Sequence, residues 1–238
     1  MVSPSEEVLI SKPPVVTTMK ANELNAQFLR TVPTLRILAP NNNTIALQTT
    51  IRNISSTRED FVFDADRLIR LVIEDALNHL PSTAKTVTTP PGGTYEGVSF
   101  AKSNCGVSIV RSGEAMEKGL RDACRAIRIG KIIIEKYESF DSQKATLSVL
   151  YAKLPDDVSL RKVLLLYPII NTGATVIKAI QLLLERNVKE ANIILINLFA
   201  TPKAIKAVSS RFTKVTIQTV DIHPIVPVHF GRKYFGTD

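Results

Sequence analysis

The 238-residue chain has no tryptophan, two cysteines and no apolar run long enough to cross a membrane. A membrane-spanning helix needs about 20 consecutive apolar residues, so no membrane partner is expected. Cys105 and Cys124 are too few for a disulfide framework, and a reducing compartment fits them. The N-terminus lacks the basic-then-apolar layout of a secretory signal. We therefore expect a cytoplasmic protein, with the nucleus left open as a second location.

Basic charge is in excess, but it is spread along the chain. Thirty basic and 22 acidic residues give a formal net charge of +8. No dense Lys/Arg block is interleaved with aromatic residues, which argues against a nucleic-acid partner. The three histidines and the scattered carboxylates show no metal-ligand spacing, so we expect no metal site in the protein. A basic surface of this kind favours small phosphorylated ligands.

The first 30 residues differ in composition from the rest. Pro4, Pro13 and Pro14 interrupt them, and no apolar period is sustained. We predict a flexible tail over residues 1–30. The 45% hydrophobic composition suffices for one core, so residues 31–238 are predicted to form a single domain.

The stretch after residue 56 predicts a long amphipathic helix. Ser56 and Glu59 have the spacing of a capping box. Apolar residues then recur every three or four positions on one face: Phe61, Ala65, Leu68, Val72, Ala76 and Leu80. Pro81 ends this helix because proline cannot continue it.

From residue 105 onward, apolar strands alternate with helix-length segments. The predicted strands are 105–110, 162–167, 193–199 and 215–220, and the predicted helices are 114–127, 175–186 and 202–210. This alternation predicts an α/β fold with a mostly parallel sheet flanked by helices. Ligands of such sheets bind beyond the carboxyl ends of the strands.

Two further segments depart from the strand–helix alternation. Strands 132–134 and 146–151 have no helix between them, which predicts an antiparallel β-arm. Because nothing in the chain covers this apolar arm, we expect a homodimer or larger assembly with residues 131–153 at an interface. Residues 223–238 are too rich in proline and glycine for a helix and are predicted to fold back as a C-terminal hood.

Two loops at strand ends are candidate anion sites. Arg111 begins the loop after the first strand, where spacing alone favours an ordinary strand–helix turn over a diphosphate contact. The loop 171–175 precedes a helix. Its threonines serve equally well as a simple helix cap or as ligands of a phosphate at the helix N-terminus.

Three motifs in order resemble the uracil phosphoribosyltransferases. They are the strand and Arg-Ser-Gly loop of 105–117, the strand and Thr-Gly loop of 163–175, and the terminal Tyr-Phe-Gly-Thr of 234–237. The resemblance runs from about Leu35 to Asp238. It implies a type I phosphoribosyltransferase-like fold and a cleft for phosphoribosyl diphosphate (PRPP), which these enzymes use with Mg2+. By resemblance the PRPP-binding set is Arg111, Lys136, Tyr167, Asn171, Thr172, Gly173, Ala174 and Thr175.

This sequence departs from the family pattern at the reacting and recognised groups. Tyr167 stands where the family has a ribose-binding Asp, and Ala174 replaces a loop glycine. Val228 and His229 stand where a Gly and an Asp read the uracil edge. The resulting degenerate uracil set is Ile225, Val228, His229, Phe230 and Gly231.

Some relatives bind GTP at a subunit interface, which implies a possible allosteric ligand here. The corresponding set is Arg58, Arg67, Lys102, Ser103, Asn104, Arg128 and Arg161.

Three functions stay open on the sequence. The first is a homologue in pyrimidine (UMP) salvage that binds PRPP or a nucleotide with weak or no activity. The second is an active enzyme that makes UMP and diphosphate from uracil and PRPP. The third is a non-catalytic regulatory or structural partner of salvage enzymes. Whether the chain is an enzyme stays undecided, and no residue is assigned a catalytic role.

Overall fold

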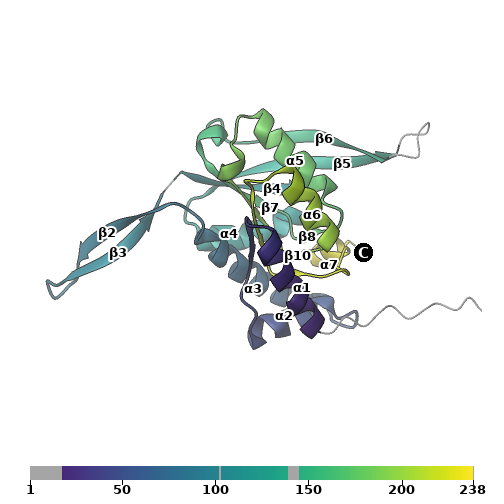
Figure 1. Ribbon diagram of the computed structural model, residues 1–238, viewed down its shortest axis with the longest axis horizontal. Coiled ribbons are helices and arrows are strands. Elements are labelled where there is room, and N and C mark those ends of the chain that lie inside the picture. Colours follow the sequence, from purple (N-terminus) through teal and green to yellow (C-terminus); the bar gives the residue numbers. More distant parts are fainter. Residues whose placement is uncertain (1–17, 102, 139–144, 238) are drawn as a thin grey trace, which may run out of the picture.

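A seven-stranded sheet forms the centre of the protein in a computed structural model, which describes residues 18–237 except 102 and 139–144 (Figure 1). The strand order is β1-β11-β9-β7-β4-β5-β6. The strands are β1 (Leu35–Ile37), β4 (Asn104–Val110), β5 (Arg128–Glu138), β6 (Ala145–Lys153), β7 (Lys162–Leu166), β9 (Ile193–Ile196) and β11 (Thr216–Thr219). Neighbouring strands are parallel except β5 and β6, which are antiparallel. The predicted α/β fold and β-arm are thereby confirmed.

The two faces of the sheet carry separate hydrophobic cores. In β7, Val163 and Leu165 belong to one core, and Leu164 and Leu166 belong to the other. This follows from the alternation of side chains along a strand. Because both faces are covered, the central strands read as continuous apolar runs.

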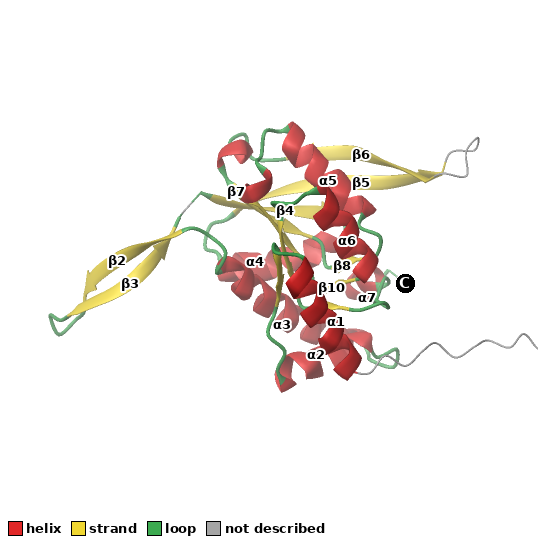
Figure 2. Ribbon diagram, viewed as in Figure 1, coloured by secondary structure: helices red, strands yellow, loops and turns green. Residues whose placement is uncertain are grey.

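Helices from different parts of the chain cover each face (Figure 2). The first core takes residues from α1 (Thr18–Thr31), α5 (Ala174–Glu185) and α6 (Pro202–Arg211). The second takes residues from α2 (Asn42–Arg52), α3 (Arg58–Leu77), α4 (Glu117–Ala123) and α7 (Phe230–Phe235). The predicted apolar face of α3 is buried, but its N-cap is Thr57, which accepts a hydrogen bond from the Asp60 amide at 3.1 Å. The capping box predicted for Ser56 is therefore wrong by one residue.

A small second sheet extends the carboxyl ends of three strands of the large sheet. Its members are β8 (Ile169–Ile170), β10 (Phe199–Ala200) and β12 (Asp221–Ile222), in the parallel order β12-β10-β8. They follow β7, β9 and β11, respectively, after a break of one or two residues. The loop that leads into α5 begins directly after β8 of this small sheet.

A hairpin of β2 (Ser82–Thr88) and β3 (Thr94–Phe100) projects from the body (Figure 1). Neither strand of this hairpin was among the strands predicted from the sequence. Tyr95 and Val98 are 62% and 66% exposed. An isolated two-stranded hairpin is marginal in water, so this hairpin depends on contacts beyond its own two strands.

The prediction of a flexible tail through residue 30 is wrong for residues 18–30, which lie in α1. Phe28 packs into the first core and is 4% exposed. The Asn25 side chain donates to Asp221 at 2.9 Å and accepts from the Ile222 amide at 3.1 Å. Residues 1–17 of the predicted tail lie outside the described residues.

The C-terminal segment folds back as predicted, but it contains the short helix α7, contrary to the expectation of no helix. Phe230 is fully buried and lies 5.3 Å from the Phe61 ring and 5.7 Å from the Tyr234 ring. Gly236 ends the helix with a φ of +67°, a conformation that glycine adopts without steric cost. Aromatic packing on α3 thus stabilises a helix that its local sequence disfavours.

Short 3-10 turns occur at three places where the sequence did not predict them. The segment predicted as one helix over 114–127 divides into a 3-10 turn, η1 (Ser112–Met116), and α4. Two more 3-10 turns, η2 (Val158–Leu160) and η3 (Glu190–Asn192), precede β7 and β9. In the described part of the chain, no helix has the length and apolar character to cross a membrane.

Packing of α1 can be tested with two neighbouring residues. We expect Phe28→Ala to lower the free energy of unfolding by about 3 kcal/mol, because it opens a cavity under α1. Leu29→Ala is the matched control: Leu29 is 46% exposed and should change stability by no more than about 0.5 kcal/mol. Urea denaturation measures both. Equal stabilities for the two variants would show that α1 does not pack on the sheet.

Candidate functional site

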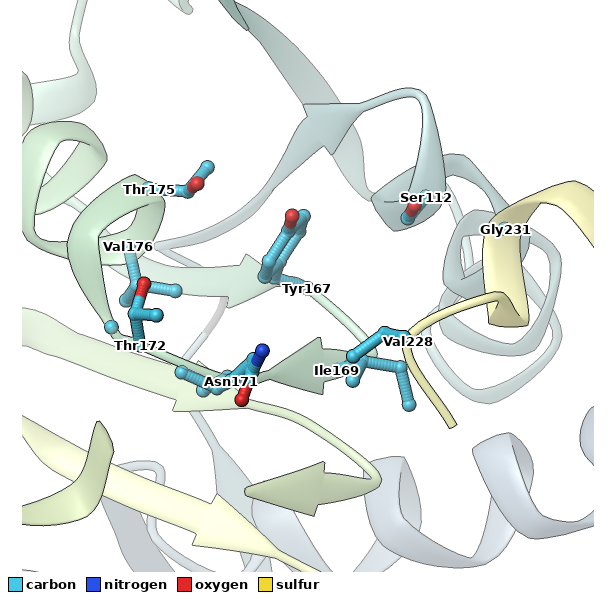
Figure 3. Close-up of a pocket in the computed structure, with 11 residues that line it drawn as sticks. Ser112, Tyr167, Ile169, Asn171, Thr172, Thr175, Val176, Val228 and Gly231 are labelled. Carbon is cyan, nitrogen blue, oxygen red and sulfur yellow. The ribbon is translucent and has the colours of Figure 1, made fainter. Parts of the chain in front are cut away.

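An open cleft of about 230 Å³ lies at the carboxyl end of β7 (Figure 3). The loop before α5 forms one wall, and η1 with the segment leading into α7 forms the other. It is lined by Ser112, Tyr167, Ile169, Ile170, Asn171, Thr172, Gly173, Thr175, Val176, Val228 and Gly231.

The loop before α5 has a backbone shape that requires glycine. Gly173 is the N-cap of α5 and has a φ of +81°, where a residue with a Cβ is strained. Thr201 supports the loop from below: its hydroxyl donates to the Asn171 carbonyl at 2.5 Å and accepts from the Ala204 amide at 3.0 Å. The loop and the start of α6 are therefore fastened together.

Several hydrogen-bond donors lie where α5 begins. The first amides of a helix have no acceptor within the helix, and here they begin with that of Ala174, which makes a long hydrogen bond of 3.4 Å to the Thr172 hydroxyl oxygen. Thr172 on the loop and Thr175 in the first turn of α5 also line the cleft with their hydroxyls. The helix dipole adds positive potential at this end. This arrangement suits an anion with several oxygens, of which phosphate is the usual biological example.

Tyr167 stands in the middle of the cleft. In Figure 3 its ring lies between Thr175 and Ser112. Burial raises the pKa of the phenol, and a hydrogen bond with Thr175 opposes that rise only in part. The phenol is therefore neutral at physiological pH and offers one donor and one acceptor.

The opposite wall is built from backbone segments in close contact. A Cβ added to Gly231 would lie 2.4 Å from the Ser112 Oγ, and one added to Gly113 would lie 2.5 Å from the Leu166 carbonyl oxygen. The C-terminal segment thus rests directly on η1, and η1 rests on the end of β7. A larger residue at Gly113 would press on the backbone and move this wall, and one at Gly231 would displace the Ser112 side chain.

Five of the eight residues in the PRPP set predicted from the resemblance line the cleft, Ala174 and Arg111 do not, and Lys136 cannot be placed. Ala174 is exposed at the start of α5 and is not among the lining residues. Arg111 precedes Ser112, and its guanidinium lies 5.8 Å from the centre of the Phe235 ring instead of in the cleft. Lys136 lies on β5, and its side chain is outside the described part of the structure.

The predicted uracil set is divided. Val228 and Gly231 line the cleft. The side chain of Phe230 is fully buried in the second core, and the ring of His229 lies 6.4 Å from that of Phe61. Ile225 is 52% exposed, and its carbonyl accepts a hydrogen bond from Arg52 at 3.1 Å. These three residues are not part of the lining.

The predicted GTP set falls into two groups within the chain. Arg58 donates to the Tyr234 carbonyl at 2.9 Å, and Arg67 contacts Asp64 and Asn43.

The second group lies at the amino ends of the strands. Arg161 pairs with Asp157 at 2.5 Å and donates to the Asn104 carbonyl, Arg128 lies 3.7 Å from Asp157, and Ser103 accepts from the Lys162 amide. Lys102 lies outside the described residues. No contact between the two groups occurs among the described residues.

Several contributors to the site were missing from the predicted set. Ser112, Ile169, Ile170 and Val176 line the cleft, and Thr201 holds the loop. A signal existed for Thr201, since Thr followed by Pro marks the start of a helix. The contribution of Ile169 and Ile170 depends on the small second sheet, which short strands of this kind do not reveal in sequence.

Comparison with known proteins places these observations in context. The family model described as uracil phosphoribosyltransferase matches residues 38–227. A uracil phosphoribosyltransferase homolog of Gallus gallus is 56% identical over 204 residues, covering 86% of this chain and 72% of that protein. A uracil phosphoribosyltransferase of Dictyostelium discoideum is 48% identical over 211 residues, covering 85% of this chain and 96% of that protein.

A solved structure supports the fold independently. It is a protein of Aquifex aeolicus, superposed with a TM-score of 0.70 at 17% identity over 86% of this chain and 99% of that one. At this identity the likeness concerns the fold alone.

The link between Thr201 and the loop leads to a stability prediction. Thr201→Val keeps the shape of the side chain and removes both hydrogen bonds, so the free energy of unfolding should fall by about 1–2 kcal/mol. Thr201→Ser keeps the hydroxyl and should retain most of the stability. Thermal and urea unfolding of the two variants test this. A valine variant as stable as the serine variant would rule out the hydroxyl as the fastening group.

Proposed function

Because this chain belongs to the uracil phosphoribosyltransferase family, we propose that its cleft binds the phosphate of PRPP or of a nucleotide, with weak or no conversion of uracil. The fold is the type I phosphoribosyltransferase-like fold. The observation that carries the proposal is Tyr167, a neutral phenol in the cleft at the end of β7. Phosphate-binding geometry is kept beside it, at the start of α5.

The ribose step is where we expect the loss of activity. Transfer of the phosphoribosyl group builds positive charge on the sugar ring, and positioned hydrogen bonds to the ribose stabilise it. The family resemblance assigns this task to a carboxylate that accepts two hydrogen bonds. Bonds to a charged group contribute roughly 1.5–3 kcal/mol each, and the neutral Tyr167 cannot replace them.

The part of the cleft where the uracil base would bind also has few groups that could recognise it. Its described lining from the C-terminal segment is Val228, which is 64% exposed, and Gly231. The Val228 side chain has no acceptor and Gly231 has no side chain, so neither residue offers a side-chain acceptor for the imide proton of uracil. A site that leaves a polar edge of its substrate unpaired loses selectivity by orders of magnitude.

An active enzyme is the second candidate function. It is favoured by the Dictyostelium relative, which is named as a uracil phosphoribosyltransferase and is covered over 96% of its length. In this case uracil would be read by backbone groups near Gly231, and the chain would produce UMP and diphosphate in pyrimidine salvage.

A non-catalytic partner of salvage enzymes is the third candidate, favoured by the two projecting hairpins (Figure 1). For any of the three we propose a location in the cytoplasm, with the nucleus open as well, since the two cysteines are free. A GTP site is proposed only between subunits, because the predicted residues form two separate groups in one chain.

Uracil conversion gives the decisive test of the proposal. We expect single-turnover conversion of labelled uracil with PRPP to be far below about 1 per second, an ordinary enzyme rate. Tyr167→Asp should rescue little, because positioned groups act together and the base side stays incomplete. Tyr167→Phe is the matched control for the loss of the phenol. Wild-type turnover of about 1 per second or faster would favour the active enzyme instead.

Association through the β5–β6 arm gives a separate test. β6 is an edge strand of the large sheet, and its Leu150 and Tyr151 are 49% and 51% exposed. Such edges favour pairing with another chain, so we expect a homodimer or larger assembly by light scattering at micromolar concentration. Replacing both residues by lysine should give a monomer. Leu160→Lys is the control, because Leu160 is 80% exposed but lies on η2. A monomeric wild type would contradict the prediction.

A further inference from the structure

The cleft is lined by neutral groups throughout. Hydroxyls or an amide come from Ser112, Tyr167, Asn171, Thr172 and Thr175, and the other lining residues are aliphatic or glycine. Among the described residues, no carboxylate and no cationic side chain belongs to the lining. This composition limits which charged ligands the cleft can stabilise.

Carboxylates on the elements that border the cleft are already engaged. Glu114 on η1 is hydrogen-bonded to Lys131, and Glu117 accepts from Ser108 at 2.5 Å and lies 3.4 Å from Lys131. Asp221 on β12 is paired with Arg52 at 2.8 Å and accepts from Asn25 at 2.9 Å. Each would have to give up a cation or a donor before it could serve a metal ion.

Mg2+ therefore does not fit the residues present. This ion is usually held by one or two carboxylates together with phosphate oxygens and water. In the part of the chain that the structure describes, no group of three or more His, Cys, Asp or Glu side chains could hold a metal ion. Burial also raises the pKa of Tyr167, so the phenol stays protonated and is not an anionic ligand.

The donors that are present suit a single phosphate. A phosphomonoester dianion can be met by the amides at the start of α5, by the dipole of that helix and by the two threonine hydroxyls. A second, diphosphate group would need cations. Arg111 is next in sequence to the lining residue Ser112, but its guanidinium lies over the Phe235 ring instead.

The volume of the cleft also favours a small ligand with one phosphate. Its volume of about 230 Å³ lies below the roughly 300–1,000 Å³ of typical ligand pockets. A pentose phosphate is a small ligand of this class. Its sugar would face Tyr167 and the aliphatic side chains of Ile169 and Val228.

We propose that the cleft takes a pentose 5-phosphate without a divalent cation, either free or as the phosphorylated end of a nucleoside monophosphate. This inference rests on the proposed phosphate-binding function and names its ligand class. Product-like monophosphates are then the ligands of this site, and Mg·PRPP is not.

Isothermal titration of the full chain distinguishes these ligands. Ribose 5-phosphate, UMP and PRPP are each titrated in EDTA and in excess MgCl2. We expect the two monophosphates to bind with a ratio of Kd values in the two buffers of about one. Tighter binding of UMP than of ribose 5-phosphate identifies the nucleotide as the source of the phosphate, and equal binding identifies the sugar phosphate alone.

Substitutions at Tyr167 add a second measurement. Tyr167→Asp brings a carboxylate into the cleft, and binding of PRPP should then become tighter in MgCl2 than in EDTA by tenfold or more. Tyr167→Phe adds no carboxylate, so the ratio of the Kd values in the two buffers should stay at about one for the monophosphates.

Two results would overturn the inference, and they are distinguishable. Wild-type binding of the phosphates that requires Mg2+ refutes the cation-free site and leaves phosphate binding by the cleft intact. Failure of all three ligands to bind in either buffer refutes the proposed function and this inference together.

Discussion

The cleft depends on three glycines, at which the chain comes too close to a neighbouring segment, or turns too sharply, for a side chain. Gly113 brings η1 onto the end of β7, and Gly231 brings the C-terminal segment onto Ser112. Gly173, with its positive φ, turns the chain from the small sheet into α5. Each contact leaves too little room or the wrong backbone conformation for a larger residue. Segments some 60 residues apart along the chain are thereby held at fixed distances around one cavity.

Within that frame, the described lining of the cleft is polar but uncharged. The loop before α5 still presents amides and threonine hydroxyls, and Thr201 still holds it from below. The central group is a neutral phenol, and the nearby carboxylates Glu114, Glu117 and Asp221 are paired with cations. Such a site can bind an anion through preorganised dipoles. Among the described lining residues, none is a charged side chain that could stabilise charge developing on a reacting sugar.

Regular periodicity explains what the sequence could predict. The buried face of α3 and the succession β7, α5, β9, α6 and β11 follow from apolar patterns that local physics fixes. The Thr-Gly loop was placed for the same reason, since it must lie at a strand end.

Tertiary contacts decide the elements that sequence reasoning missed. α1 depends on Phe28 and on the bonds of Asn25 to β12, and α7 depends on the packing of Phe230 against α3. The same holds for site membership: Phe230 and Val228 are two residues apart, yet one is in the core and the other faces the cleft. Spacing along the chain does not carry that information, because a turn lies between them.

The pairing of β1 with β11 has a consequence for how the protein is made. Leu35 lies opposite Ile217 in a parallel register, so one edge of the sheet joins the two ends of the chain. Contacts between such distant positions form late, because closing the long intervening loop costs entropy. During synthesis, β1 has no strand to pair with until β11 has left the ribosome. The sheet is thus completed at this edge only after residue 219 has been synthesised, and β1 waits for β11.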